Sequence, residues 1–148
     1  MSDAMAMLKQ DHERMKKLLG DIDSTTERAL KTREEMIDKV RAELGVHERI
    51  EEEIFYPALR EHDKAKEIVL EAYAEHRAVD ILLDELDGVP FGDEDWGARF
   101  AVIKENIEHH IEEEEGELFT KARQLLDDAQ LEELGARMEE LKAATGGT

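Results

Sequence analysis

The sequence predicts an all-α fold, an antiparallel up-down-up-down four-helix bundle with a short extra C-terminal helix. Three observations support this prediction. Charged residues make up 40% of the 148-residue chain and only two prolines interrupt it, a composition typical of helical proteins. Apolar residues recur at helical spacing over four long stretches. Short joints connect these stretches, so each helix can pack against the next one in the opposite direction.

The first two predicted helices run from about Asp3 to Thr26 and from about Lys31 to Glu61. The apolar stripe of the first helix also carries His12, and that of the second also carries His47 and Glu51. Pro57 lies near the end of the second helix. Because proline lacks a backbone N–H and its ring clashes with the preceding turn, we expect a kink there.

The third predicted helix, about Lys64 to Leu86, carries His76 on its apolar stripe. The segment DGVPFGD, residues 87–93, then interrupts the helical pattern with two glycines and a proline in seven residues. The fourth helix, about Glu94 to Leu126, carries His110 and Glu114 among its apolar residues. Each of the four helices therefore places at least one histidine on its inward face.

A short last helix is expected to begin after Asp127 or Asp128, either of which can cap it, and to end at about Lys142 before a frayed TGGT tail. The length of the chain suits one ordinary domain with its own core. We therefore assign residues 1–126 to the bundle and residues 127–148 to the C-terminal helix and tail.

Charge and cysteine content narrow the class of partner. A formal net charge of −19 repels phosphate backbones and anionic lipid, so we expect neither a nucleic-acid nor a membrane partner. The absence of cysteine excludes disulfides and thiolate metal sites, so any metal ligands must be nitrogen or oxygen atoms. No signal peptide and no run of 18 apolar residues is found, and we expect a soluble cytoplasmic protein.

The most informative feature is a sparse pattern that occurs twice. His12, His47 and Glu51 are matched by a second set, His76, His110 and Glu114, at offsets of 64, 63 and 63 residues. The neighbouring segments FYPALR, residues 55–60, and LFTKAR, residues 118–123, match as well. The chain thus consists of two related helix pairs, each of which brings two imidazoles and a carboxylate to a shared place.

These polar residues share helix faces with apolar ones. His47 and Glu51 are four residues apart, as are His110 and Glu114, so each pair points into the bundle. A single histidine on an apolar face is more often a core residue with a hydrogen-bond partner. An ionised carboxylate in the core, however, costs on the order of several kcal/mol unless a cation or several donors compensate it. No lysine or arginine shares those faces, and the pattern therefore favours a metal site.

The number and spacing of the candidate ligands indicate the kind of site. Six ligands exceed the four of a structural zinc site, and two shared glutamates suit a centre with two metal ions. Imidazole and carboxylate ligands suit iron, manganese or zinc. Ferritin-like di-iron proteins use Glu-x-x-His, and zinc peptidases use His-Glu-x-x-His; neither spacing occurs in this sequence.

Four segments resemble the hemerythrin-like, or HHE cation-binding, family: DHERM from Asp11, HERIEEEIFYPAL from His47, EHRAV from Glu75 and HHIEEEEGELF from His109. The resemblance extends from about Met7 to Arg123. It implies an antiparallel four-helix bundle around a non-haem di-iron pair, with two bridging carboxylates and an oxo or hydroxo bridge.

The same resemblance assigns a role to each of the six residues. His12 and His47 would hold one iron ion, His76 and His110 the other, and Glu51 and Glu114 would bridge the two. The oxygen carriers of the family space their last histidine and carboxylate five residues apart, which His109 with Glu114, or His110 with Glu115, would satisfy. The internal repeat favours His110 with Glu114.

One position departs from the oxygen-carrying members. These have a fifth histidine four residues before the one that matches His76, where this chain has Ala72. The departure implies an additional open position at the metal. Tyr73 or Asp80 could approach the metal, but we expect both to pack around the ligands or form hydrogen bonds to them instead. We expect His62 at the surface, and we expect an acidic fringe around the ligands, namely Glu48, Glu52, Glu53, Glu112, Glu113 and Glu115.

Two classes of function follow. In the first, a di-iron centre reacts with small oxidants, namely hydrogen peroxide, dioxygen or nitric oxide, and most readily decomposes or scavenges peroxide. In the second, the chain is a non-catalytic module that binds or senses iron, oxygen or nitric oxide. The absence of an appended signalling or DNA-binding segment favours the first class. Reversible oxygen carriage is less favoured than either class, because Ala72 replaces a histidine ligand of the oxygen carriers.

Overall fold

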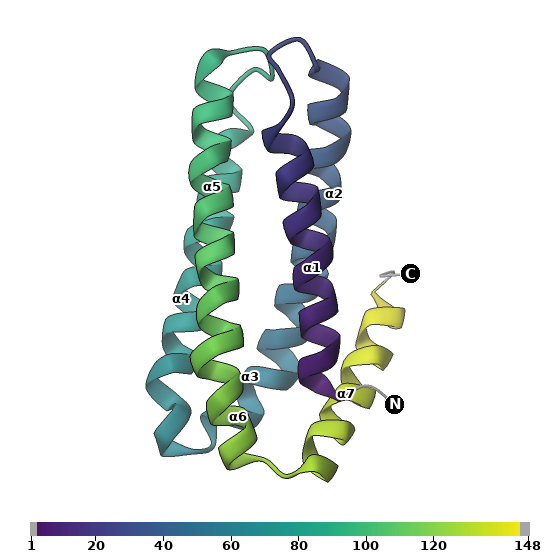
Figure 1. The fold of residues 1–148 in the computed structure, drawn as a ribbon, viewed down its shortest axis with the longest axis vertical. Helices are drawn as coiled ribbons and strands as arrows, with labels where there is room; N and C mark the ends of the chain where they lie inside the picture. Colours follow the sequence, from purple (N-terminus) through teal and green to yellow (C-terminus); the bar gives the residue numbers. More distant parts are fainter. Residues whose placement is uncertain (1–2, 146–148) are drawn as a thin grey trace.

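The structure, a computed structural model, describes residues 3–145 and confirms the predicted all-α bundle. Four long helices run alternately up and down the long axis of the molecule (Figure 1). They are α1 (Ala4–Asp23), α2 (Leu30–Ile50), α4 (Asp63–Leu86) and α5 (Glu94–Glu113). Asp3 and Asp93 cap α1 and α5 by accepting hydrogen bonds from backbone N–H groups of the first turn. No β-strand occurs among the described residues.

Two π-helical turns interrupt the second and fourth predicted helices. The first, η1 (Glu51–Phe55), joins α2 to α3 (Tyr56–Arg60), and the second, η2 (Glu114–Leu118), joins α5 to α6 (Phe119–Leu125). In both turns a backbone N–H reaches the carbonyl five residues earlier, from Tyr56 to Glu51 and from Phe119 to Glu114. Such turns are frequent at functional sites. Each begins at a predicted glutamate ligand.

The expected kink at Pro57 takes the form of the first π turn, which ends just before the proline. Pro57 cannot donate a backbone hydrogen bond, which disfavours regular α-helix at this point. The second turn, however, contains no proline. Proline is therefore not required for the feature, and the sequence offered no local signal for its second copy.

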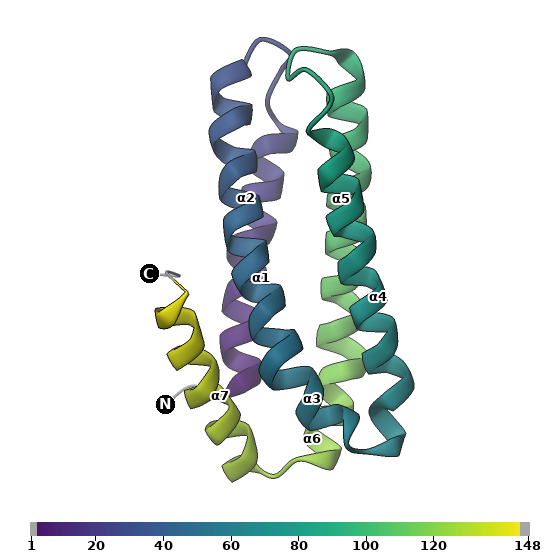
Figure 2. The ribbon, with the colours of Figure 1, turned by 180° about the vertical axis from the view of Figure 1, so that it is seen from behind.

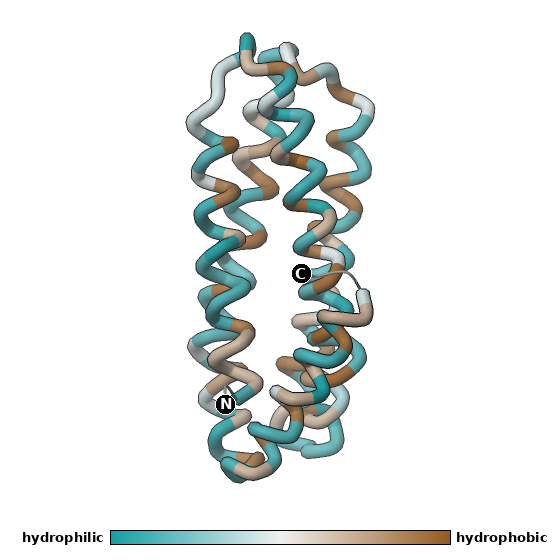
Figure 3. The backbone as a smooth tube through the Cα atoms, turned by 90° about the vertical axis from the view of Figure 1, so that its right-hand side faces the viewer, coloured by the Kyte–Doolittle hydropathy of each residue, from teal (hydrophilic) through white to brown (hydrophobic). Residues whose placement is uncertain are grey.

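The core consists of two apolar clusters at opposite ends of the bundle, with the predicted ligands between them. One cluster, near α3, α6 and the start of α1, includes Leu8, Phe55 and Phe119. The other, near the α4–α5 connection, includes Leu19, Trp96 and Phe100. Brown, hydrophobic stretches alternate with teal, hydrophilic ones along the helices (Figure 3), as expected of helices that bury one face.

The last helix, α7 (Asp128–Ala144), turns back along the outside of α1 (Figure 2). Asp127, one of the two predicted caps, forms a capping box with Gln130. Leu131 and Met138 of α7 belong to the same apolar cluster as Leu8 of α1. The helix therefore packs on the bundle core. Of the predicted frayed tail, residues 146–148 lie outside the described residues.

The far end of the bundle is held by Arg33, which is buried. Its guanidinium group donates to the carbonyl oxygen of Phe91 at 2.5 Å and to the hydroxyl oxygen of Thr25 at 2.9 Å, and it lies 4.6 Å from the centre of the Trp96 ring. These contacts join the α1–α2 connection to the α4–α5 connection. None of the described helices has both the length and the apolar character needed to cross a membrane.

Candidate metal centre

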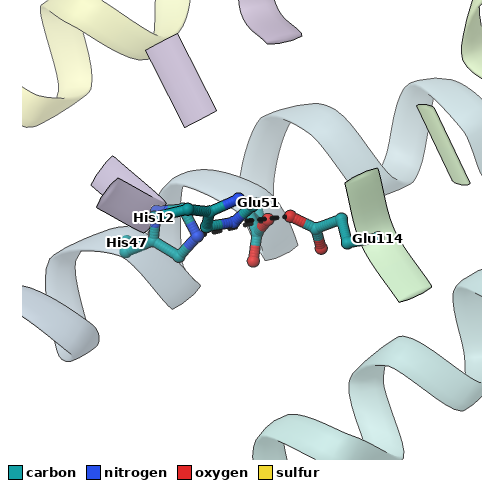
Figure 4. A group of neighbouring side chains, drawn as sticks. All are labelled: His12, His47, Glu51 and Glu114. Carbon is teal, nitrogen blue, oxygen red and sulfur yellow. Dashed lines mark ion pairs between the residues drawn. The ribbon is translucent and has the colours of Figure 1, made fainter. Parts of the chain in front are cut away.

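The structure brings the six predicted ligands together in the middle of the bundle, where all six are buried. One group, in which one possible ligand atom from each residue lies within 4.8 Å of the others, consists of His12, His47, Glu51 and Glu114 (Figure 4). A second group of the same kind consists of Glu51, His76 and His110. Because Glu51 belongs to both groups, the two positions are adjacent.

Each glutamate spans the two positions. Glu51 directs Oε2 to Nε2 of His47 at 3.3 Å and Oε1 to Nε2 of His76 at 3.0 Å. Glu114 directs Oε1 to Nε2 of His12 at 3.1 Å and Oε2 to Nε2 of His110 at 3.2 Å. Each carboxylate therefore offers one oxygen atom to each histidine pair, which is the arrangement that a bridging ligand requires.

Four of these ligand atoms have no hydrogen-bond partner, although each is buried. They are Nε2 of His12, Nε2 of His47, Oε2 of Glu51 and Oε1 of Glu114. Buried polar atoms without partners are rare because they cost free energy of desolvation that nothing returns. A cation between them would satisfy all four. Imidazole nitrogen and carboxylate oxygen are ligands suited to iron, manganese or zinc, so the residues present fit a transition-metal centre.

A second set of carboxylates holds the opposite edge of every imidazole. Each ring donates its Nδ1–H to a carboxylate from a different helical segment. The four pairs are His12 with Glu115 at 2.6 Å, His47 with Asp11 at 3.0 Å, His76 with Glu52 at 2.7 Å and His110 with Glu75 at 2.7 Å. A carboxylate at Nδ1 fixes the ring orientation and leaves the Nε2 lone pair free for a metal ion.

These partners extend the internal repeat. Asp11 and Glu75 each precede a histidine ligand directly, whereas Glu52 and Glu115 each follow a glutamate ligand directly. Sequence reasoning placed Glu52 and Glu115 in a general acidic fringe and gave Asp11 and Glu75 no role. The repeat itself contained the signal, because an acidic residue precedes the first histidine and follows the glutamate in both halves.

Tyr56 also belongs to the site and was not predicted from the sequence. Its hydroxyl group donates to Oε2 of Glu114 at 2.5 Å and lies 3.1 Å from Oε1 of Glu51. The same oxygen lies 3.3 Å from Nε2 of His76 and 3.4 Å from Nε2 of His110. Burial, together with the two carboxylates, raises the pKa of Tyr56 well above its ordinary value, so the phenol keeps its proton when no cation is present.

Four other residues considered from the sequence lie outside this cluster. The hydroxyl group of Tyr73 donates to the backbone carbonyl of Glu52 at 3.1 Å, and Asp80 is exposed. His62, expected at the surface, is half-buried and precedes the first turn of α4. The side chain of His109 is 66% exposed and pairs with Glu113, so the histidine that faces Glu114 is His110.

The carboxylates also determine where protons reside. Burial opposes the charged form of His47, but Glu51 and Asp11 outweigh this effect and raise its pKa to about 10. Burial likewise opposes the charged form of His110, and Glu114 with Glu75 raises its pKa to about 11. The pKa of Glu51 lies well below its ordinary value, since the neighbouring histidines outweigh the effect of burial. Without a cation, His47 and His110 are therefore imidazolium groups at neutral pH, each paired with carboxylates.

A cavity of about 660 Å³ opens on one side of the centre. All four histidines line it, together with Met15, Leu44, Val79 and Ile107, each of which lies three residues from one of the histidines. The space beside Ala72, on the other side of His76 along α4, has a volume of only about 10 Å³. That is room for about one water molecule. The main opening to the centre is therefore on the side of Val79.

Comparison with known proteins identifies the class. A family model, the hemerythrin HHE cation binding domain, matches residues 3–122, and the chain belongs to this family. The resemblance predicted from the motifs is thereby confirmed.

Among similar proteins are the uncharacterized protein Rv2633c of Mycobacterium tuberculosis and the uncharacterized protein Mb2666c of Mycobacterium bovis. Each is 30% identical over 154 residues, which cover 96% of this chain and 89% of the relative. A similar solved structure is that of a hemerythrin HHE cation binding domain-containing protein from Mycobacterium kansasii, described as a homolog of Rv2633c. It has a TM-score of 0.85 and 32% sequence identity, and the match covers 97% of this chain and 90% of that one.

Proposed function

We propose that the protein holds two iron ions through the six residues and reacts with small oxidants. Hydrogen peroxide is the preferred oxidant in this proposal, and dioxygen and nitric oxide are the alternatives. The observation that carries this proposal is the position of the two glutamates. Each offers one oxygen to a histidine of each pair, and four of the buried ligand atoms lack a hydrogen-bond partner. One cation at the His12–His47 position would satisfy these four atoms, and the other oxygen of each glutamate faces His76 or His110, where a second cation would bind.

The proximity of the side chains supports one assignment of the six ligands. His12 and His47 would hold one ion, His76 and His110 the other, and Glu51 and Glu114 would bridge the two. When bound, two iron ions supply a redox couple that can exchange two electrons with a peroxide. The carboxylates at the Nδ1 atoms keep the four imidazoles in place and in the tautomer that binds metal.

The chain provides a proton and a protected approach. Tyr56 holds a proton on its hydroxyl group between the two glutamates, next to Nε2 of His76 and His110. This proton is placed for exchange with a small oxygen-containing ligand at the centre. The apolar side chains of Met15, Leu44, Val79 and Ile107 surround the histidines where these face the cavity, which lowers the polarity of the approach.

The decisive measurement is oxygen release from hydrogen peroxide, followed with an oxygen electrode. Iron-loaded protein should release dioxygen faster than the same amount of free iron. A His110→Ala variant carried through the same loading protocol should fall to the level of free iron. If the wild-type protein releases no more dioxygen than free iron does, the enzymatic proposal fails.

A second candidate, a metal-responsive binding module, is favoured by one contact. Lys142 of α7 donates to Oδ1 of Asp11 at 2.6 Å, and Asp11 accepts the Nδ1–H of His47. The last helix is thus connected to a ligand of the centre through two hydrogen bonds, a path by which metal binding could affect its docking. Turnover of peroxide distinguishes the two candidates, because a module that only binds or senses would show none.

A further inference from the structure

The cavity beside the centre is far larger than a diatomic molecule or hydrogen peroxide requires. Its volume is about 660 Å³. On the same measure, one water molecule needs roughly 10–15 Å³, and hydrogen peroxide is only slightly larger than water. Cavities of roughly 300–1,000 Å³ are typical of sites for organic ligands of moderate size. The size of the space therefore calls for an explanation beyond access for a small oxidant.

The cavity is also elongated. Where it meets α4 and α5, it touches only residues within about one turn of the histidines, from Glu75 to Val79 and from Ile107 to Ile111. Along α1, in contrast, its lining extends from Asp11 to Asp21. Ten residues of helix correspond to about 15 Å at about 1.5 Å per residue. The space is thus a chamber at the histidines that continues as a channel between α1 and α2.

The channel has an apolar floor and a charged rim. Met15, Leu18, Met36 and Leu44 supply the apolar side chains of this part. At the rim, cations are paired with acids: Lys17 lies 3.0 Å from Asp21, and Arg14 lies 2.6 Å from Asp11. These pairs cancel much of the local negative charge of a chain with a net charge of −19. The channel can therefore accept an apolar chain and does not repel a single negative charge.

We propose that this cavity binds a medium-chain alkyl molecule with an oxygen-bearing head, either a carboxylate or a hydroperoxide. The head reaches the four histidines and the metal ions, and the alkyl chain lies in the channel between α1 and α2. A chain of about ten carbons fits within the length of about 15 Å along α1. This inference deepens the proposed function, on which the role of the head rests, since it names a class of substrate or ligand for the same centre.

Calorimetric titration with decanoate tests the proposal, with acetate as a ligand that has the same head and lacks the chain. Iron-loaded protein should bind decanoate at least about tenfold more tightly than acetate, because each buried methylene contributes about 0.8 kcal/mol. Metal-free protein should bind decanoate more weakly than iron-loaded protein does, since the head then lacks its partner. If acetate and decanoate bind equally well, the alkyl chain does not lie in the channel. If decanoate binds equally well with and without iron, its carboxylate does not contact the metal ions.

Variants locate the alkyl chain. Leu18→Glu and Met36→Glu each place a charge in the channel at half-buried positions away from the six ligands, and each should abolish the advantage of decanoate over acetate. Ile81→Glu is the matched control, because Ile81 is 58% exposed and lies outside the cavity lining. An unchanged advantage in both channel variants, each shown to be folded by circular dichroism, refutes the proposal.

A further arm distinguishes the two heads. If the centre accepts a hydroperoxide, decyl hydroperoxide should compete with decanoate in the titration. If it does not compete, the site binds carboxylates and not hydroperoxides. The binding readout is independent of peroxide decomposition. Failure of the oxygen-electrode experiment with intact decanoate binding would therefore reject the proposed activity and leave the ligand site standing.

Discussion

Tyr56 and Phe119 occupy equivalent positions in the two halves of the bundle, but only Tyr56 carries a hydroxyl group. They lie 63 residues apart, the same offset that separates Glu51 from Glu114. Phe119 stacks on His12 with ring centres 6.3 Å apart, and Tyr56 stacks on His76 with ring centres 5.5 Å apart. The two candidate metal positions therefore differ in a buried hydroxyl group, which lies beside His76 and His110.

We predict that Tyr56→Phe makes the two positions more alike while both ions are retained. In the iron-loaded variant, the two Mössbauer quadrupole doublets should converge. In the metal-free variant, the free energy of unfolding should fall by about 1–2 kcal/mol, because Glu114 loses a buried hydrogen-bond donor. Tyr73→Phe is the control, since the Tyr73 hydroxyl group bonds only to a backbone carbonyl outside the six ligands. Identical spectra for Tyr56→Phe and wild type would contradict this role.

The adjacent histidines His109 and His110 should differ in their effect on metal content. His110 is buried beside Glu114, whereas the side chain of His109 is 66% exposed. Elemental analysis should find two iron ions per chain in the wild type and in His109→Ala, and substantially less iron in His110→Ala. Loss of iron from His109→Ala with retention in His110→Ala would show that the other histidine is the ligand.

Metal binding should release protons and strengthen as the pH rises. His47 and His110, with pKa values of about 10 and 11, are protonated at neutral pH in the metal-free protein, and a metal ion must displace those protons. Between about pH 6 and pH 8, binding should therefore tighten continuously with pH. If both histidines had the ordinary pKa of 6.5, the affinity for metal would instead stop increasing near pH 8. Calorimetry in buffers of different ionisation enthalpy counts the released protons, and a count of zero at pH 7 contradicts the prediction.

The same pKa shifts make the metal-free protein sensitive to alkali. A histidine whose folded pKa is raised stabilises the fold fully below its unfolded pKa, and this contribution is lost as the pH rises through the folded value. The metal-free protein should thus become less stable between about pH 7 and pH 11, whereas the iron-loaded protein, in which the ions replace the protons, should not show this loss. Urea unfolding at several pH values measures both curves.

The helices and the six candidate ligands could be predicted because both depend on local spacing. Apolar residues at helical intervals determine which face of each helix points inward, and that face carried His12, His47, His76 and His110. The 63- to 64-residue repeat then related the two halves. No three-dimensional information was needed to see that the imidazoles and carboxylates would converge.

What the sequence did not reveal depends on contacts between helices. Tyr56 reaches the centre because a π turn rotates it inward five residues after Glu51, and the one-turn spacing used to find ligands does not include that interval. Tyr73, in contrast, lies three residues before His76, about one helical turn away, which made it a candidate from the sequence. The pairing of Asp11 with His47 joins residues on different helices, so only the packing of α1 against α2 reveals it.

Lys142 provides the final prediction, because it makes the surroundings of the two histidine pairs unequal. It donates to Asp11, the partner of His47, at 2.6 Å, whereas the only ion pair of Glu75, the equivalent partner of His110, among the described residues is with His110 itself. Burial alone would raise the pKa of Asp11, but His47 and Lys142 lower it to about 2. A carboxylate with a depressed pKa stabilises the fold above its unfolded pKa, and this contribution disappears as the pH falls towards 2.

Lys142→Met should therefore destabilise the metal-free protein by about 1 kcal/mol at pH 7 and by less near pH 3, because Asp11 loses a charged hydrogen bond and α7 loses a contact with α1. In the iron-loaded protein, one of the two Mössbauer doublets should shift while the other stays in place, since only His47 is connected to Lys142. Lys17→Met removes a cation from the exposed pair with Asp21 and should change neither quantity appreciably. A shift of both doublets in Lys142→Met, or of neither, would mean that the C-terminal helix does not act on one metal position through Asp11.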